Sequence, residues 1–190
     1  MANDVKVKAR AYLRAKGTLQ PVAVIAERVR AAFTAFEEVV DSVSAREAAA
    51  VGIAEEWTVQ EVVDHLVETE RPSLDELRCL LAGRRPPGSP IPASLQSRAP
   101  LLRPWPWLLR ELKTVQRDVV ATLEAVPPDF HTDATAALVM VVNTPRPDGG
   151  VEPLSWIEEL DWKAYALVFR LHEIDHLNQV KKVLAAARGV

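Results

Sequence analysis

The chain has 190 residues, of which 48% are hydrophobic and 26% charged, and its net charge is −3. This is the composition of an ordinary soluble globular protein, and the length predicts one domain spanning residues 1–190. The weak negative charge excludes an electrostatic case for nucleic acid or for an anionic membrane surface as a partner. The single cysteine, Cys79, excludes an internal disulfide. With no signal-peptide core and no apolar run that spans a bilayer, we expect a cytoplasmic location.

Two helices are expected in the first forty residues. Residues 1–20 form an N-terminal extension, in which Asp4 can cap a short helix and Gly17 can end it. Pro21 is well placed in the first turn of a second helix. That helix carries apolar residues at helical spacing, which predicts a buried stripe made of Val22, Ile25, Ala26, Val29, Ala32, Phe33, Phe36 and Val40.

Three further helices follow along the chain. Thr58 and Glu61 form a capping-box pattern at the start of a helix that continues or restarts past Pro72 and stops at Gly83. A proline-rich loop comes next, then helices over about 106–126 and 154–187. The insertion between these two helices, residues 127–153, contains an apolar run at 137–142 that can form a short strand. Four main amphipathic helices predict an all-α protein built as a four-helix bundle.

A histidine pair stands on the last helix. Residues 172–176 read H-E-I-D-H and match the zinc-protease pattern H-E-x-x-H. Four-residue spacing places His172 and His176 on one face of the helix, one turn apart. The other members of this row are apolar, so the two imidazoles lie on a core-facing surface where a shared metal ion would satisfy both.

The protease interpretation requires a third metal ligand further along the chain. Residues 177–190 contain no His, Asp, Glu or Cys, so we interpret the protease match as fortuitous and Glu173 as a glutamate of the helix surface. His65 lies at the border of the apolar face of the Thr58 helix and is the best third ligand. Three neutral imidazoles suit zinc, nickel or iron. His131, in the insertion, is expected at the surface.

Two segments together resemble the DinB-like (YfiT-like) superfamily. In "EEWTVQEVVDHLVETE", Trp57 and Thr58 open the helix, and His65 and Leu66 follow. In "LHEIDHLNQV", the histidine pair is followed by Gln179 and Val180. The similarity extends over about residues 21–188, and the N-terminal helix and the 127–153 insertion depart from the family's pattern.

The resemblance implies a four-helix bundle with an up-down-down-up course and a metal centre at His65, His172 and His176. It further implies zinc or nickel as the metal, a homodimer, and in some relatives a low-molecular-weight thiol, such as bacillithiol or mycothiol, as co-substrate. A small-molecule substrate and a thiol-dependent S-transferase-type reaction are the leading expectation. Two alternatives stay open: a metallohydrolase on the same centre, and a non-catalytic, stress-related helical dimer that binds a metal.

Roles around the centre are less defined by the sequence. Four carboxylates adjoin the predicted ligands: Asp64, Glu68, Glu173 and Asp175. We expect each to be a solvated charge on its helix rather than a group that orients a ligand, and as orienting groups we rank Glu68 and Asp175 above the others. Trp57 is expected to pack at the start of its helix, and the aromatic segment 104–107 to pack in the core or at a dimer interface rather than line a cleft. Cys79 is expected to be an inert buried thiol.

Overall fold

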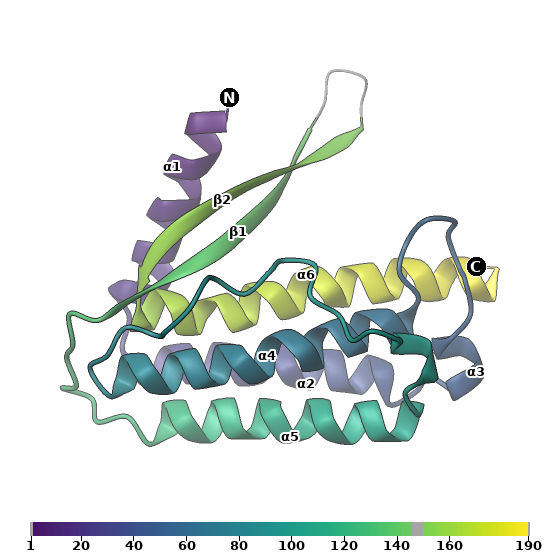
Figure 1. Ribbon diagram of the computed structural model, residues 1–190, viewed down its shortest axis with the longest axis horizontal. Coiled ribbons are helices and arrows are strands. Elements are labelled where there is room, and N and C mark those ends of the chain that lie inside the picture. The colour runs from purple at the N-terminus through teal and green to yellow at the C-terminus, as the bar shows by residue number, and fades with distance from the viewer. Residues whose placement is uncertain (1, 146–149, 190) are drawn as a thin grey trace.

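The computed structural model of the chain describes residues 2–145 and 150–189, and four long helices dominate it (Figure 1). The bundle consists of α2 (Val22–Val40), α4 (Val59–Leu81), α5 (Trp105–Glu124) and α6 (Trp162–Arg188). Helix α2 packs against α5 and α6, and α4 packs against the same two helices. In Figure 1, α2 and α6 run away from the hairpin end of the molecule, whereas α4 and α5 run toward it. The predicted four-helix bundle is therefore confirmed.

The apolar stripe of α2 is the one its spacing predicts. All eight residues of that stripe are buried, with Ile25, Val29 and Phe36 completely inaccessible. The stripe faces the other three helices because apolar side chains three and four residues apart share one side of a helix. Each bundle helix buries such a face, and packing of these faces supplies most of the stability of the helices.

Helix α4 begins and ends as its sequence indicates. The Thr58 side chain accepts a hydrogen bond from the backbone of Glu61, and the Glu61 carboxylate accepts one from the backbone of Thr58. The helix continues without a break through Pro72. It ends at Leu81, after which Gly83 adopts a left-handed conformation with φ of 70°. The capping box fixes where α4 starts, and this matters because His65 lies in its second turn.

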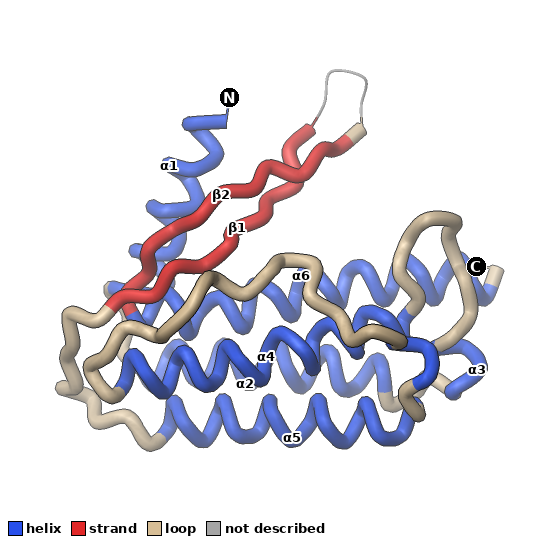
Figure 2. Tube along the Cα trace, in the orientation of Figure 1, coloured by secondary structure: helices blue, strands red, loops and turns tan. Residues whose placement is uncertain are grey.

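A β-hairpin corrects the all-α prediction and the predicted start of the last helix (Figure 2). Strands β1 (Thr135–Pro145) and β2 (Val151–Asp161) pair antiparallel along their whole length. The apolar run at 137–142, which can form a short strand by its sequence, lies within β1, but the hairpin extends past the predicted insertion end at 153. Residues 154–161 are strand and not helix, because alternate side chains, Trp156 and Leu160 among them, are buried against the bundle. Helix α6 starts only after Asp161, whose carboxylate accepts hydrogen bonds from the next turn.

The N-terminal extension packs against the hairpin. Helix α1 (Ala2–Leu13) continues into a π-helical turn, η1 (Arg14–Thr18), and Asp4 lies inside α1 and is not its cap. Arg10 forms an ion pair with Glu158 of β2 at 2.9 Å. A Cβ at Gly17 would lie 2.9 Å from the Ala164 backbone, so only glycine permits this close approach of η1 to α6.

Two short helices complete the molecule, and the apolar core fills the space between the long ones. Helix α3 (Ala45–Ala48) follows α2, and the 3₁₀ turn η2 (Pro100–Leu102) precedes α5. Three of the five tryptophans, Trp105, Trp156 and Trp162, are buried within this single chain. The number of tryptophans is thus explained without a second copy, and the homodimer stays a prediction. Among the described residues, no helix has the length and apolarity needed to cross a membrane.

Candidate metal centre

Helices α4 and α6 bring the three predicted histidines together. The Nε2 atom of His172 lies 3.0 Å from Nε2 of His65 and 3.1 Å from Nε2 of His176. His65 is 1% exposed, whereas His172 and His176 are only partly buried. The ligand atoms of all three lie within 4.8 Å of one another, and in the described part of the chain no other group of three or more His, Cys, Asp or Glu residues meets this condition.

The outer ring nitrogens of two of these histidines are held by oxygen acceptors. Nδ1 of His65 donates to the carbonyl oxygen of Leu95 at 2.7 Å, and Nδ1 of His176 donates to Oε1 of Gln179 at 2.9 Å. Because these oxygens only accept, both Nδ1 atoms carry the proton in a neutral ring. The Nε2 atoms of both rings are then unprotonated, and their lone pairs point toward His172. A histidine that binds a metal through one ring nitrogen usually donates its other N–H to an oxygen in this way.

The surroundings keep the three rings neutral. Burial lowers the pKa of His65, and it lowers that of His172 well below 6.5, with a further contribution from the two neighbouring imidazoles. Burial, together with His65, lowers the pKa of His176 to about 4. At neutral pH the cluster therefore presents unprotonated nitrogens, which is the state that binds a metal.

These three residues fit a metal ion. Two imidazole nitrogens held at about 2.0–2.1 Å by one tetrahedral zinc ion lie about 3.3–3.4 Å apart. The separations of 3.0 and 3.1 Å from His172 are shorter than this by only a few tenths of an ångström. Without a cation, lone pairs of His65 and His176 converge on a nitrogen that can donate to only one of them. Since two of the rings are partly exposed, a further coordination position would face solvent, which is typical of catalytic sites.

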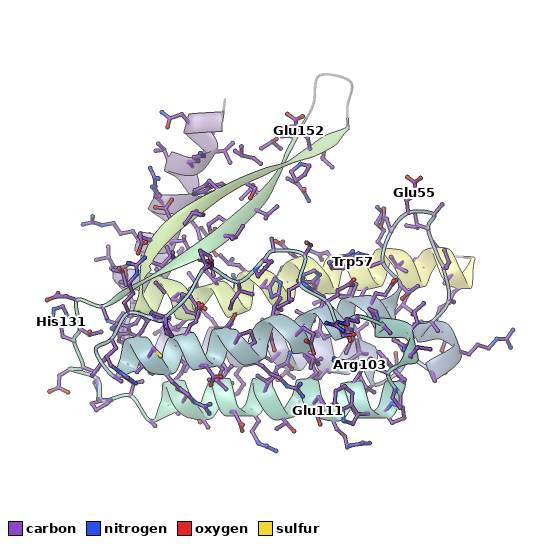
Figure 3. All side chains as sticks on the ribbon, in the orientation of Figure 1. Glu55, Trp57, Arg103, Glu111, His131 and Glu152 are labelled. Carbon is purple, nitrogen blue, oxygen red and sulfur yellow. The ribbon has the colours of Figure 1, made fainter. Side chains whose placement is uncertain are left out.

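Trp57 forms one wall of the centre. Its ring lies 5.0 Å from the ring of His65 and stacks on that of His176 at 6.3 Å with an interplanar angle of 12°. Trp57 lies in the loop between α3 and α4, just before the capping box, and Figure 3 shows it above α4 near the start of that helix. The prediction that Trp57 packs at the start of the helix is confirmed, and the structure adds that it packs on two of the metal-ligand candidates.

The proline-rich loop after α4 returns to the centre and is attached there by buried polar groups. The Asp64 carboxylate, which is completely buried, accepts hydrogen bonds from the backbone and the side chain of Ser97 at 2.8 Å. It also pairs with Arg103 at 3.1 Å. These contacts hold the loop against α4, and the loop in turn places the Leu95 carbonyl at His65. Sequence reasoning missed this contact, because a backbone carbonyl in a loop leaves no signal in the sequence.

The predicted orienting carboxylates do not contact the rings. Within the described residues, Glu68 pairs with Arg103 at 2.6 Å, and no hydrogen bond joins Asp175 to a histidine. The group that orients His176 is Gln179, one helical turn further on. The ranking of Glu68 and Asp175 is therefore wrong. A polar residue three positions after a ligand, on the same side of the helix, was the signal that could have identified Gln179.

Glu173 is a buried residue and not the surface glutamate that we expected. It is completely inaccessible, and its Oε1 accepts a hydrogen bond from Nε2 of Gln116 on α5 at 2.9 Å. Its carboxyl group also interacts with Glu70 of α4. A protease glutamate would have to face the metal's open side, whereas this one faces the interior. The geometry thus agrees with a fortuitous H-E-x-x-H match.

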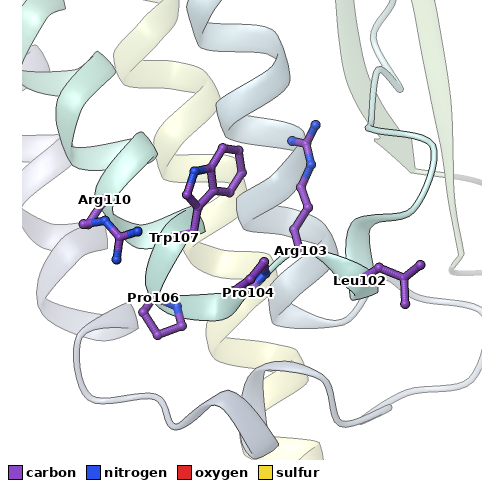
Figure 4. Close-up of a pocket in the computed structure, with 6 residues that line it drawn as sticks. All are labelled: Leu102, Arg103, Pro104, Pro106, Trp107 and Arg110. Atoms are coloured by element: carbon purple, nitrogen blue, oxygen red, sulfur yellow. The ribbon is translucent and has the colours of Figure 1, made fainter.

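The remaining candidates lie away from the centre. The side chain of His131 is 82% exposed, and it lies at the opposite end of the bundle from Trp57 (Figure 3). Cys79 is only half-buried. The expectation of a buried thiol at this position is therefore wrong. Of the aromatic segment, Trp105 is in the core, whereas Trp107 lines a surface groove of about 490 Å³ together with Arg103 and Arg110 (Figure 4). Of the two arginines, Arg103 is already paired with two carboxylates, Asp64 and Glu68.

The fold and the site define a class: helical-bundle proteins with a three-histidine group that can hold a metal ion. The structure of YfiT from Bacillus subtilis, described as a probable metal-dependent hydrolase with an unusual four-helix bundle topology, has a similar fold. The two structures have a TM-score of 0.64 over 93% of this chain and 98% of the other, with 13% sequence identity. At this identity the similarity shows the fold alone. No family model and no curated protein matches the sequence.

Proposed function

We propose that His65, His172 and His176 hold a divalent metal ion, with zinc or nickel preferred, and that the protein hydrolyses a small molecule at this centre. The observation that carries the proposal is the convergence of three neutral imidazole nitrogens at 3.0 and 3.1 Å, with two of the rings fixed from behind by oxygen acceptors. A cation between the nitrogens would satisfy the lone pairs of His65 and His176 together, which one neutral His172 cannot do.

The residues of the chain define what such a centre does. Leu95 and Gln179 fix two imidazoles in one tautomer, and Trp57 covers one side of the rings and limits the direction from which a substrate approaches. When bound, the metal would act as a Lewis acid and lower the pKa of a water molecule to near neutrality. The description of YfiT as a probable metal-dependent hydrolase supports this choice of reaction.

The position of Glu173 restricts the substrate class. Within the described residues, no carboxylate is hydrogen-bonded to the three rings, and Glu173, the acid of the protease pattern, is turned toward α5. Glu173 is therefore not in place to protonate a poor leaving group such as an amine. We infer that the substrates have good leaving groups, as activated esters do, and that peptide bonds are not cleaved.

Thiol transfer is the second candidate on the same centre. A thiol such as bacillithiol or mycothiol would be acidified by the metal and would need no separate base, which agrees with the same lack of a carboxylate at the rings. A non-catalytic role, in which the metal only stabilises the bundle, is the third. We also propose a homodimer, which sedimentation would test against the single-chain mass of 21.0 kDa.

One assay separates these candidates. Zinc- or nickel-loaded protein is incubated with an activated aryl ester, with and without a low-molecular-weight thiol. We expect metal-dependent ester hydrolysis without thiol, its loss in His65→Ala, and full activity in His131→Ala. If turnover requires the thiol, the protein is a thiol transferase and not a hydrolase. If protein fully loaded with metal shows no turnover in either condition, the metal has only the structural role.

A second variant tests the position of Glu173. Glu173→Gln keeps the size of the side chain and removes its ability to act as a base. We expect the hydrolysis rate to change less than about threefold, because losing a true general base costs on the order of 10²–10⁴. A loss of that size with unchanged metal content at the histidines would show that the H-E-x-x-H match has catalytic meaning.

A further inference from the structure

A second polar cluster lies inside the bundle, where the residue after His172 on α6 meets α4 and α5. It consists of Glu70 of α4, Gln116 of α5 and Glu173 of α6, none of them more than 1% exposed. Gln116 donates to Glu173 at 2.9 Å, and the carboxyl groups of Glu70 and Glu173 interact directly. Glu37 of α2 is close enough to act on both carboxyl groups. All four bundle helices thus contribute a polar side chain to one point of the interior.

The oxygens of this cluster lack donors. Among the described residues, four buried oxygens have no hydrogen-bond partner at all: Oε1 and Oε2 of Glu70, Oε1 of Gln116 and Oε2 of Glu173. Buried acceptors without partners are rare, because their desolvation is not compensated. Each of these atoms is an acceptor while the carboxyl groups are unprotonated, so what is missing at this point is a proton or a cation. Lys113 is the cation that acts on Glu37, and it is itself paired with Asp41 at 2.7 Å.

A groove on the surface between α2 and α5 reaches one member of this cluster, Gln116. It has a volume of about 260 Å³, and Glu37 and Gln116 line it. The arginines of its rim are paired with carboxylates of their own, Arg30 with Glu124 and Arg117 with Asp118. The groove therefore reaches Glu37 and Gln116, and Gln116 in turn donates to the buried Glu173.

We propose that Glu70, Glu173 and Gln116 form a second metal site, which takes a hard divalent cation such as Mn²⁺. Carboxylate and amide oxygens with water are the ligands that Mg²⁺, Ca²⁺ and Mn²⁺ prefer, whereas the imidazole centre suits softer ions. Two carboxylates balance the charge of a divalent ion, and the groove supplies water for the remaining positions. Bundle cores hold sites of this kind, assembled from facing helices.

The two buried carboxylates need a proton or a cation to compensate their negative charge. Burial raises the pKa of Glu70 to about 8, and burial together with Glu70 raises that of Glu173 well above 4.5. A proton shared between them is the alternative to a cation, and the experiment decides between the two.

Manganese binding to zinc-loaded protein tests the proposal. Zinc fills the imidazoles first, and the electron paramagnetic resonance signal of free Mn²⁺ then reports how much manganese the protein removes from solution. We expect about one Mn²⁺ per chain beyond the zinc, and an affinity weakened more than about tenfold in Glu70→Gln. Glu38→Gln removes the same charge from an exposed neighbour of Glu37 and should leave binding unchanged. Zinc-loaded protein that binds no Mn²⁺, or binds it equally in Glu70→Gln, would overturn the site in favour of protons.

Two further variants keep the test independent of folding and of the imidazole centre. Gln116→Leu removes one ligand oxygen together with the amide that donates to Glu173, and it should also weaken Mn²⁺ binding if Glu70→Gln fails to fold. His176→Ala removes the imidazole centre, and we expect it to retain the manganese site. If the unmodified chain binds Mn²⁺ but no zinc, the histidine centre is disproved and the proposed manganese site is not.

Discussion

The two sides of α6 near residue 172 present different chemistry to the bundle. On one side, His172 and His176 meet His65 with nitrogen lone pairs, next to solvent and under Trp57. On the other, Glu173 meets Glu70 and Gln116 with oxygens, fully enclosed. Successive residues of a helix point about 100° apart, so adjacent positions can serve two separate environments. A sequence motif on a helix, such as H-E-x-x-H, therefore indicates a function only when each of its residues faces the same site in the structure.

The largest effect is expected on the nitrogen side. His172 lies between the other two imidazoles, so His172→Ala removes the ligand that both of them approach. We expect zinc affinity to fall well beyond the about 10–100-fold caused by losing an outer contact. Competition with a chromophoric chelator measures it, with His131→Ala as the matched control. An unchanged zinc affinity in His172→Ala would disprove the proposed three-histidine metal centre.

Metal removal separates stability from function. The apolar faces of α2, α4, α5 and α6 remain packed without a metal, so chelated protein should keep its helical circular dichroism. Its free energy of unfolding should fall by about 2.7–4.1 kcal/mol relative to protein with a hundred- to thousand-fold excess of metal over the Kd. Chemical denaturation with and without chelator measures this. Loss of helicity on chelation would instead mean that the metal is required for folding.

A smaller effect is expected from the outer contact of His176. Gln179→Ala removes the acceptor that fixes the Nδ1 proton of His176, and we expect zinc to bind about 10–100-fold more weakly. Asn178→Ala changes an exposed neighbour of similar size and should have no effect. Equal affinities in both variants would show that the rings are fixed by packing against Trp57 and not by their hydrogen bonds.

The smallest effect lies at the end of α6, away from both sides. Ser44, through its side chain and backbone, and Arg188 lower the pKa of Glu47 to about 2. Because this pKa is below the ordinary value of 4.5, the stabilisation is present above pH 4.5 and is lost as the pH falls toward 2. The stability difference between wild type and Glu47→Gln should therefore shrink over this range in urea titrations. A difference that does not depend on pH would mean that the carboxylate's charge is not involved.

Local patterns in the sequence determined much of the fold. The stripe of α2, the capping box at Thr58 and the stop at Gly83 follow from interactions within a few residues, and all three are where the sequence predicts them. The grouping of His65 with the histidine pair was also predictable, because it requires only that two amphipathic helices pack face to face. The identity of the metal and the reaction stay predictions.

Only the tertiary structure decided the rest, because the deciding contacts join distant segments. Residues 154–161 became a strand through pairing with β1, which a helix-compatible sequence does not reveal. The Leu95 carbonyl reached His65 because Asp64 holds Ser97, and a backbone atom has no sequence signature. Glu173 was buried because Gln116, 57 positions away, lies opposite it across the bundle. Spacing along one helix is local information, whereas the partner that a side chain meets depends on how the helices pack.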